Sequence, residues 1–225
     1  MAVIDPGPDD DSHLAAINKR LAGATVGVVL VTHSHPDHLP LAERLAGPHH
    51  ASVRRFPELG DGDVVRVGTL NVTALHTPGH SADHISFWLD GDRAAFTGDL
   101  ILGRGSSMVM YPEGDVAAYL RSLDRLAALK PRMLFPGHWD PVTDAPGKID
   151  EYRTHRLQRE AQVLAEVKRG GGTADELTRR VYGSDLDEKL MVAAAMTLRA
   201  HLRKLVDDGA VRVRHGDLYE STAEI

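Results

Sequence analysis

The stretch His33-Ser34-His35-Pro36-Asp37-His38 places three imidazoles and one carboxylate within six residues. It follows an apolar run from Val26 to Thr32, which is typical of a strand buried on both faces. Side chains in a turn at the end of a strand can converge on a shared cleft without opening the core. The sequence therefore predicts a metal site at the C-terminal end of this strand.

Three more potential ligands stand in the same structural context farther along the chain. Each follows an apolar stretch and lies in a tight turn: His80 after Thr77-Pro78-Gly79, Asp99 after Thr97-Gly98, and His138 after Pro136-Gly137. The chain contains no cysteine, so a metal has to be held by imidazole nitrogens and carboxylate oxygens. These ligands suit zinc, and iron and manganese also accept them.

Seven ligands are too many for one tetrahedral ion, and they divide into two sites that share one group. The predicted ligands are His33, His35, Asp37, His38, His80, Asp99 and His138. Two ions about 3.5–4 Å apart can deprotonate a shared water near neutral pH. We expect two divalent metal ions as cofactors, and we expect Asp37 also to orient or deprotonate the nucleophilic water.

The rest of the chain divides into a mixed α/β part and a helical part. Strands are predicted at residues 64–67, 70–75, 85–89, 94–97 and 133–135, with helices at 12–21, 39–45, 116–129 and 149–168. Gly170-Gly171-Gly172 is the best candidate linker. Helices at 174–182 and 188–207 and a hairpin near residues 211–219 then follow in the order of a winged helix. We predict a catalytic domain at 1–150, a connecting helix at 151–169 and a winged-helix domain at 170–225.

With its His-x-His-x-Asp-His motif and downstream partners, the chain resembles the metallo-β-lactamase superfamily. The resemblance implies an α/β fold, the four-layer αββα sandwich. It also implies that the first metal is held by His33, His35 and His80, the second by Asp37, His38 and His138, with Asp99 bridging them. Within the superfamily, the chain is similar to the lactamase-beta-like hydrolases with a C-terminal winged helix. The similar strings are 3–7, 77–84, 98–103 and 152–156. Such relatives have several dozen residues before the Val-Ile-Asp-Pro-Gly strand, so the first β-hairpin of the sandwich is expected to be missing here.

The resemblance implies a hydrolase whose metal-bridging hydroxide attacks an ester or thioester, as in glyoxalase-II-like enzymes. A single-strand endoribonuclease or phosphodiesterase is an alternative, in which the winged helix guides RNA. Lactonase or β-lactamase activity is a third possibility, although the missing cysteine excludes the lactamase branch that uses Cys as a ligand. His155 and Arg156 are candidates to bind a substrate carboxylate or phosphate.

The charge and hydropathy of the chain limit the kinds of ligand and the location that we expect. The net charge is −6, and residues 1–151 hold 13 Lys and Arg against 20 Asp and Glu. Residues 152–225 hold 13 against 12, so an anionic ligand is expected there if anywhere. No apolar run approaches the ~18 residues of a membrane span, and the N-terminus lacks a signal-peptide pattern. We expect a cytoplasmic enzyme that acts on a small ester or thioester or on single-stranded RNA, with a homodimer as a possible assembly.

Overall fold

The structure is a computed structural model and describes residues 1–222. The chain divides into two compact units. The first consists of Met1–Pro78, Asp83–Ser107 and Ser122–Ile149, and the second of Gly79–Ala82, Met108–Arg121 and the residues from Asp150 onward.

The first unit begins with a three-stranded parallel sheet. Its strands are β1 (Ala2–Ile4), β2 (Val28–Leu30) and β3 (Ser52–Arg54), in the order β1-β2-β3. The central strand is fully buried, as the apolar run predicts, but it is shorter than that run. β3 was not predicted from the sequence, because Ser52-Val53-Arg54 has only one apolar residue.

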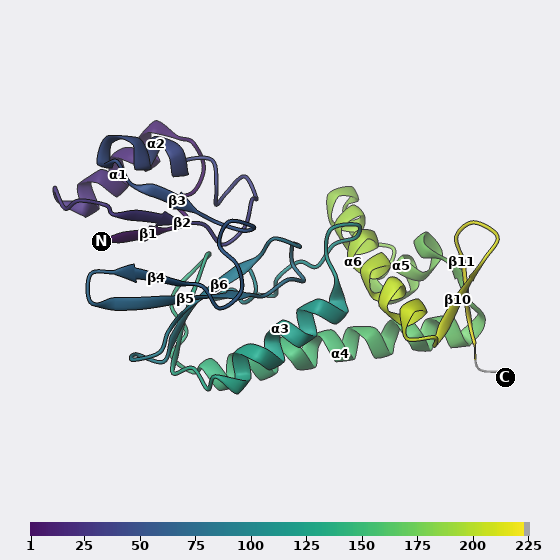
Figure 1. Cartoon of the computed structure of the whole chain (residues 1–225). Helices are drawn as coiled ribbons and strands as arrows, with labels where there is room; N and C mark the ends of the chain where they lie inside the picture. The colour runs from purple at the N-terminus through teal and green to yellow at the C-terminus, as the bar shows by residue number, and fades with distance from the viewer. Residues whose placement is uncertain (223–225) are drawn as a thin grey trace. The chain divides into compact units, whose positions relative to one another are not determined.

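Alternate residues of the central strand face two different layers. Val29 and Val31 pack with the helices α1 (Asp11–Leu21) and α2 (Ala42–Ala46) in one apolar cluster. Val28 and Leu30 pack in a second cluster with residues of the other sheet, among them Phe87. This is the period-two alternation of a strand between two apolar layers. Figure 1 shows α1 and α2 on the outer side of β1, β2 and β3.

The second sheet of this unit has five strands in the order β4-β5-β6-β7-β8. They are β4 (Val64–Val67), β5 (Leu70–His76), β6 (Ile85–Leu89), β7 (Ala94–Gly98) and β8 (Met133–Pro136). Neighbours are antiparallel except β7 and β8, which are parallel. All five strands were predicted: Gly-Asp type turns separate the first four, and Met133-Leu134-Phe135 is a short apolar run typical of a buried strand.

A helix covers the outer face of the five-stranded sheet. In the part of α3 (Val116–Ala128) that belongs to the first unit, Leu123 and Leu126 are fully buried. Arg125 on the same turns donates to His76 O and pairs with Asp61. Helix, sheet, sheet and helix form the predicted αββα sandwich. Between the two sheets lies a cavity of about 710 Å³, lined by residues that include Met1, Ile4, Leu70 and Phe135, beside the outer strand β1.

The second unit contains a small helical core with a β-wing. Its elements are the C-terminal part of α4 (Ala145–Gly170), β9 (Gly172–Thr173), α5 (Ala174–Tyr182), α6 (Glu188–Asp207), β10 (Val211–Arg214) and β11 (Leu218–Ser221). Thr173 and Glu176 form a capping box at the start of α5. Leu177, Leu198 and Val211 lie in one buried cluster, so α5, α6 and the wing share a core. The helix order and the wing are those of the predicted winged helix.

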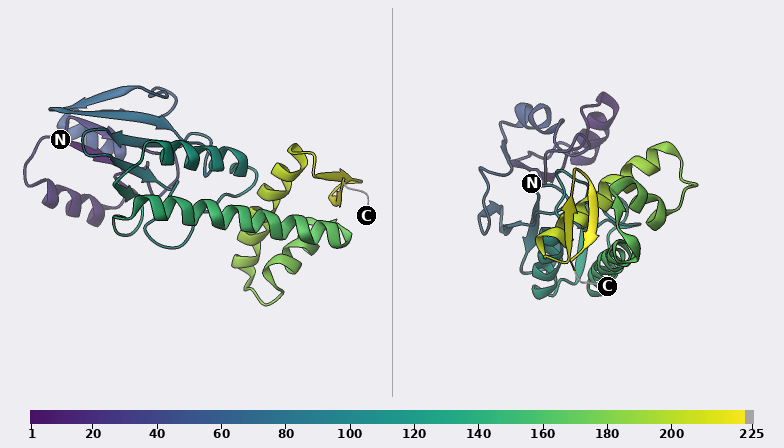
Figure 2. Two further views of the ribbon diagram at one scale, coloured as in Figure 1. Left: turned by 90° about the horizontal axis from the view of Figure 1, so that it is seen from below. Right: turned by 90° about the vertical axis from the view of Figure 1, so that its right-hand side faces the viewer.

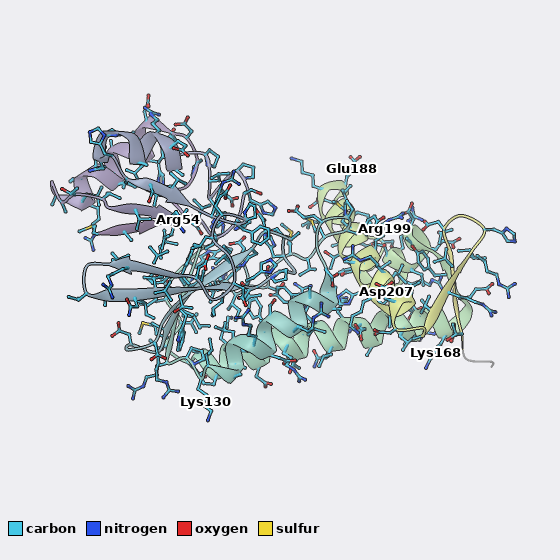
Figure 3. All side chains as sticks on the ribbon, in the orientation of Figure 1. Arg54, Lys130, Lys168, Glu188, Arg199 and Asp207 are labelled. Carbon is cyan, nitrogen blue, oxygen red and sulfur yellow. The ribbon has the colours of Figure 1, made fainter. Side chains whose placement is uncertain are left out.

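Figure 2 shows α4 as one uninterrupted helix, which begins four residues before the predicted start at residue 149. Figure 3 shows Arg199 on the side of α6, with Glu188 and Asp207 at the two ends of that helix.

Within residues 1–222, none of the helices combines the length and the apolar character needed to cross a bilayer.

The contact between the sheets yields a first prediction. Leu30 is fully buried between them, so Leu30→Ala should lower the free energy of unfolding by about 2–5 kcal/mol through lost burial and a residual cavity. Chemical denaturation measures this change. Leu70→Ala is the matched control, because Leu70 is 48% exposed and its replacement should change stability far less. Equal effects of the two replacements would contradict the sandwich packing.

The buried His201 in α6 makes the winged-helix unit acid-sensitive. Burial, together with the nearby positive charges of Arg156, Arg159 and Lys204, lowers its pKa from 6.5 to about 3, and within residues 1–222 neither ring nitrogen has a hydrogen-bond partner. The unfolded chain therefore binds more protons between these two pKa values, and stability falls as the pH drops below about 6.5. The slope should reach at most about 1.4 kcal/mol per pH unit. Denaturation of wild type and His201→Leu from pH 7 to 4 measures it.

His201→Leu should flatten that pH dependence. The exposed His215 provides the control, since His215→Gln should leave the profile unchanged. A profile of the same steepness in His201→Leu would show that other groups cause the acid sensitivity.

Candidate metal centre

Asp5, directly after β1, organises the turn that follows β2. Its Oδ1 accepts a hydrogen bond from Thr32 N and its Oδ2 accepts one from Thr32 Oγ1, both at 2.7 Å. The same Oδ2 lies 2.9 Å from His38 Nδ1. A proton on Nδ1 completes this contact, so Nε2 is the nitrogen of His38 that can act as a ligand atom. Asp5 thus fixes both the orientation and the tautomer of His38.

His84 plays a similar part for the turn after β7. Its Nε2 accepts a hydrogen bond from Asp99 N at 3.1 Å, and its Nδ1 lies 2.9 Å from Thr77 Oγ1. Gly98 precedes Asp99 at φ +46°, and a Cβ there would stand 2.8 Å from His84 Nε2 and 2.6 Å from Thr32 Oγ1. The Asp99 turn can therefore approach the β2 turn closely only because residue 98 is glycine.

Four of the predicted ligands surround one point. His138 Nε2 lies 3.1 Å from Asp37 Oδ2 and 3.5 Å from Asp99 Oδ1. His38 Nε2 lies 3.7 Å from Asp37 Oδ2 and 3.4 Å from Asp99 Oδ1. Ligands at about 2.0–2.1 Å around a tetrahedral ion stand about 3.3 Å apart. The spacing of these donor atoms therefore fits one divalent ion. Gly137 permits it, because a Cβ there would stand 2.7 Å from His38 Cε1.

The electrostatics of this group also favour a cation. Burial alone would lower the pKa of His38, but the carboxylates of Asp5 and Asp99 outweigh it and raise that pKa from 6.5 to about 10. The side chain of Asp99 is only 14% exposed, whereas that of Asp37 is 53% exposed. Carboxylates held this close to a buried imidazole stabilise positive charge at the position between them, whether a proton or a metal ion supplies it.

The other group of predicted ligands consists of His33, His35 and His80. His33 and His35 belong to the first unit, and their rings meet edge-on with centroids 4.5 Å apart. His80 lies in the turn of residues 79–82, which belongs to the second unit. His80 Nδ1 lies 2.6 Å from Met108 O, so Nε2 is the nitrogen that can face a metal.

Asp99 connects the two groups. Ligand atoms of His33, His38 and Asp99 lie within 4.8 Å of one another, so the Asp99 carboxylate is near an imidazole of each group. A shared carboxylate is what the sequence predicted from the number of ligands. The first unit thus brings together six of the seven predicted ligands, and the assignment of all seven to two metal ions stays a prediction.

His155 and Arg156, the predicted substrate contacts, lie in the part of α4 that belongs to the second unit. Arg156 is only 3% exposed, and its guanidinium packs over the ring of Tyr119 at 5.2 Å. Burial, with the neighbouring charges of Arg156 and Arg159, lowers the pKa of His155. Arg156 therefore has a packing role within the second unit, and the assignment of both residues to substrate stays a prediction.

Comparisons with known proteins agree with this geometry. Residues 53–138 match the family model of the metallo-beta-lactamase superfamily, and residues 173–219 match that of the beta-lactamase associated winged helix domain. The lactamase-like protein adaB of Aspergillus niger is 35% identical over 93% of this chain and 72% of its own length. The chain belongs to the metallo-β-lactamase superfamily. Both the family and the winged helix predicted from the sequence are confirmed.

Two further similarities describe this metallo-β-lactamase-fold chain more closely. An atrochrysone carboxyl ACP thioesterase of Aspergillus fumigatus is 31% identical over 93% of the chain, which spans 55% of that relative. The crystal structure of a beta-lactamase domain protein from Burkholderia ambifaria superposes with a TM-score of 0.86, at 24% identity, covering 98% of this chain and 82% of that one. As a superfamily member, the chain is a metal-dependent hydrolase.

Asp5 had no predicted role, although its position in the sequence carried a signal. Asp5 directly follows an apolar strand and precedes Pro6-Gly7, the same context that identified His80 and His138. A role for Asp5 was not predicted because Asp5 stands far from the histidine cluster in the sequence. Its contact with His38 depends on the parallel pairing of β1 with β2, which brings the ends of the two strands together.

The Asp5–His38 contact yields a prediction about metal affinity. Asp5→Asn removes the carboxylate that orients His38, so metal binding at the His38, Asp37 and His138 group should weaken about 10–100-fold. Competition with a chelator at fixed pH measures the affinity. Asp9→Asn is the control, because Asp9 pairs with Arg44 on the surface. Unchanged affinity in Asp5→Asn would mean that Asp5 serves the fold alone.

Proposed function

We propose that this chain is a two-metal hydrolase of thioesters. The observation that carries the proposal is the position of Asp99, whose carboxylate lies near His33 of one ligand group and near His38 and His138 of the other. A carboxylate in this position suits a bridge between two ions. Zinc fits the imidazole and carboxylate donors, and iron or manganese would fit them as well.

Two divalent ions held here would supply a hydroxide nucleophile near neutral pH and positive charge for the oxyanion of the substrate. The protein's own residues prepare the site for that chemistry. Asp5 orients the side chain of His38, and His84 holds the turn that carries Asp99. Asp37, the most exposed of the three carboxylates at the His38 group, reaches both the ligand atoms and solvent. We assign to Asp37 the orientation or deprotonation of the attacking water, in addition to ligation.

The choice of a thioester rests on the relative whose name states its activity. That relative is a thioesterase, and its similarity extends over 93% of this chain. Thioester hydrolysis adds water to the carbonyl carbon, breaks the C–S bond, and releases a carboxylic acid and a thiol. This reaction needs a nucleophile and an oxyanion site, and no cysteine or serine nucleophile has to be found in the chain.

Ion pairing in the winged-helix unit argues against RNA as the substrate. Arg199 pairs with Asp175 and Asp217, and Lys204 pairs with Glu160 and Asp208. In the wing, Arg212 and Arg214 both pair with Glu220. Nucleic-acid affinity comes mainly from Lys and Arg that neutralise phosphates. Basic residues that already face carboxylates contribute less to such a surface, which favours the small thioester.

Parallel assays of the metal-loaded protein test the proposal. We expect hydrolysis of S-D-lactoylglutathione or of an acyl N-acetylcysteamine thioester to exceed that of a lactone, of nitrocefin and of labelled single-stranded RNA. Asp37→Ala should lower the thioesterase rate at least about hundredfold, and metal analysis should find about two ions per chain in wild type and about one in Asp37→Ala.

Asp92→Ala is the control for these assays, since Asp92 is an exposed turn residue between β6 and β7. Full activity of Asp37→Ala, or one ion per chain in the active wild type, would refute the two-metal proposal. Cleavage of RNA with no hydrolysis of any thioester would refute the substrate assignment.

A further inference from the structure

Trp139 lies next to the metal centre with most of its side chain exposed. It directly follows His138 in the turn after β8, and its indole meets the imidazole of His138 edge-on, with ring centroids 5.9 Å apart. The side chain is 60% exposed, whereas Trp88, the other tryptophan of the chain, is 6% exposed. A large aromatic surface is therefore presented to solvent beside a ligand of the proposed second metal.

The backbone of Trp139 does not favour this residue. Its φ is +65°, in the left-handed region that glycine adopts readily and a bulky residue adopts only with strain. Burial of the side chain does not offset this backbone strain, because Trp139 is more than half exposed. The stability of the fold therefore gives no reason for tryptophan at this position. Strained residues whose side chains gain little from packing are found mostly at functional sites.

The turn holds the indole in a fixed position. Leu134 and Val142 exchange two backbone hydrogen bonds of 3.0 and 2.9 Å across the base of the loop that carries Trp139. His138 O accepts a third from Gly103 N at 3.1 Å. A Cβ on Gly103 would stand 3.1 Å from Trp139 Cβ, so the backbone of the 99–107 loop packs directly against this turn. A rigid aromatic face binds with little loss of conformational entropy.

We propose that Trp139 determines the acyl-group specificity of the thioesterase and that its indole binds a flat, aromatic or conjugated acyl group. The proposal rests on the proposed function. A carbonyl carbon attacked at the metal centre carries its acyl substituent within a few ångströms of the ligands. The exposed indole, beside His138, is an apolar surface within that reach. Aromatic rings gain from stacked or edge-to-face contact with a flat group beyond the gain from buried area.

Substitutions at this position separate specificity from folding. Trp139→Gly removes the indole and relieves the backbone, so its unfolding midpoint should equal or exceed that of wild type. Trp139→Phe keeps an aromatic face. Both variants should retain about two metal ions per chain, because the ligand His138 is unchanged.

The decisive measurement compares N-acetylcysteamine thioesters of 2-naphthoic acid and of acetic acid. Trp139→Gly should lower kcat/KM for the naphthoyl thioester about tenfold, mainly through KM, and change that for the acetyl thioester less than about twofold. Trp139→Phe should recover most of the naphthoyl activity. Equal losses on both thioesters, or no loss on either, would overturn the proposal.

Binding of the product acid gives a readout that does not need turnover. 2-Naphthoate should quench the fluorescence of the exposed Trp139 in wild type, while Trp139→Phe, which keeps only the buried Trp88, should show no such response. Absence of quenching in wild type would overturn the proposal. Wild type that binds naphthoate through Trp139 but hydrolyses no thioester would refute the proposed function and leave the flat-ligand surface established.

Discussion

The contact on which the metal centre depends is made by the carboxylate of Asp5. It joins the end of β1 to the turn after β2 through two hydrogen bonds to Thr32, and it orients His38 through Nδ1. A carboxylate this buried has to be fully hydrogen-bonded, since an unpaired buried charge is strongly unfavourable. The interaction that joins the two strand ends is therefore also the one that directs Nε2 of His38 toward Asp99 and Asp37. The carboxylate of Asp5 therefore serves both the fold and the candidate metal site.

The second constraint on the site is steric. Three turns from β2, β7 and β8 approach within the spacing of metal ligands, and two of them do so at glycines. Gly98 lies against Thr32 and His84, and Gly137 lies against His38. A side chain at either position would separate the turns by more than the ligand geometry tolerates. The glycines before Asp99 and His138 are therefore part of the metal centre although they offer no ligand atom.

Features that neighbouring residues determine could be predicted from the sequence. Features that depend on contacts between residues far apart in the sequence could not. The candidate ligands were predictable because they stand in turns that follow apolar strands, and strand ends at one edge of a sheet converge. The elements α5 and α6 were predicted to the residue, since capping residues and Gly170-Gly171-Gly172 mark their limits locally. β3 was missed because its pairing with β2 determines it rather than its own apolar pattern. Trp139 was missed for the same reason, since its φ and its exposure are properties of the folded turn.

The two units use charge in opposite ways, and this bears on the kind of substrate. Around His38, three carboxylates crowd a buried imidazole and leave a net demand for positive charge, which metal ions would meet. In the winged-helix unit, Arg212 and Arg214 share Glu220, and Arg199 lies between two aspartates, so the positive charge of these three residues is neutralised locally. A winged helix in which these basic residues are paired internally keeps the shape of a nucleic-acid-binding module with a weaker positive potential. The specificity of such an enzyme then has to come from surfaces beside the ligands, and the exposed, rigidly held indole of Trp139 is one such surface.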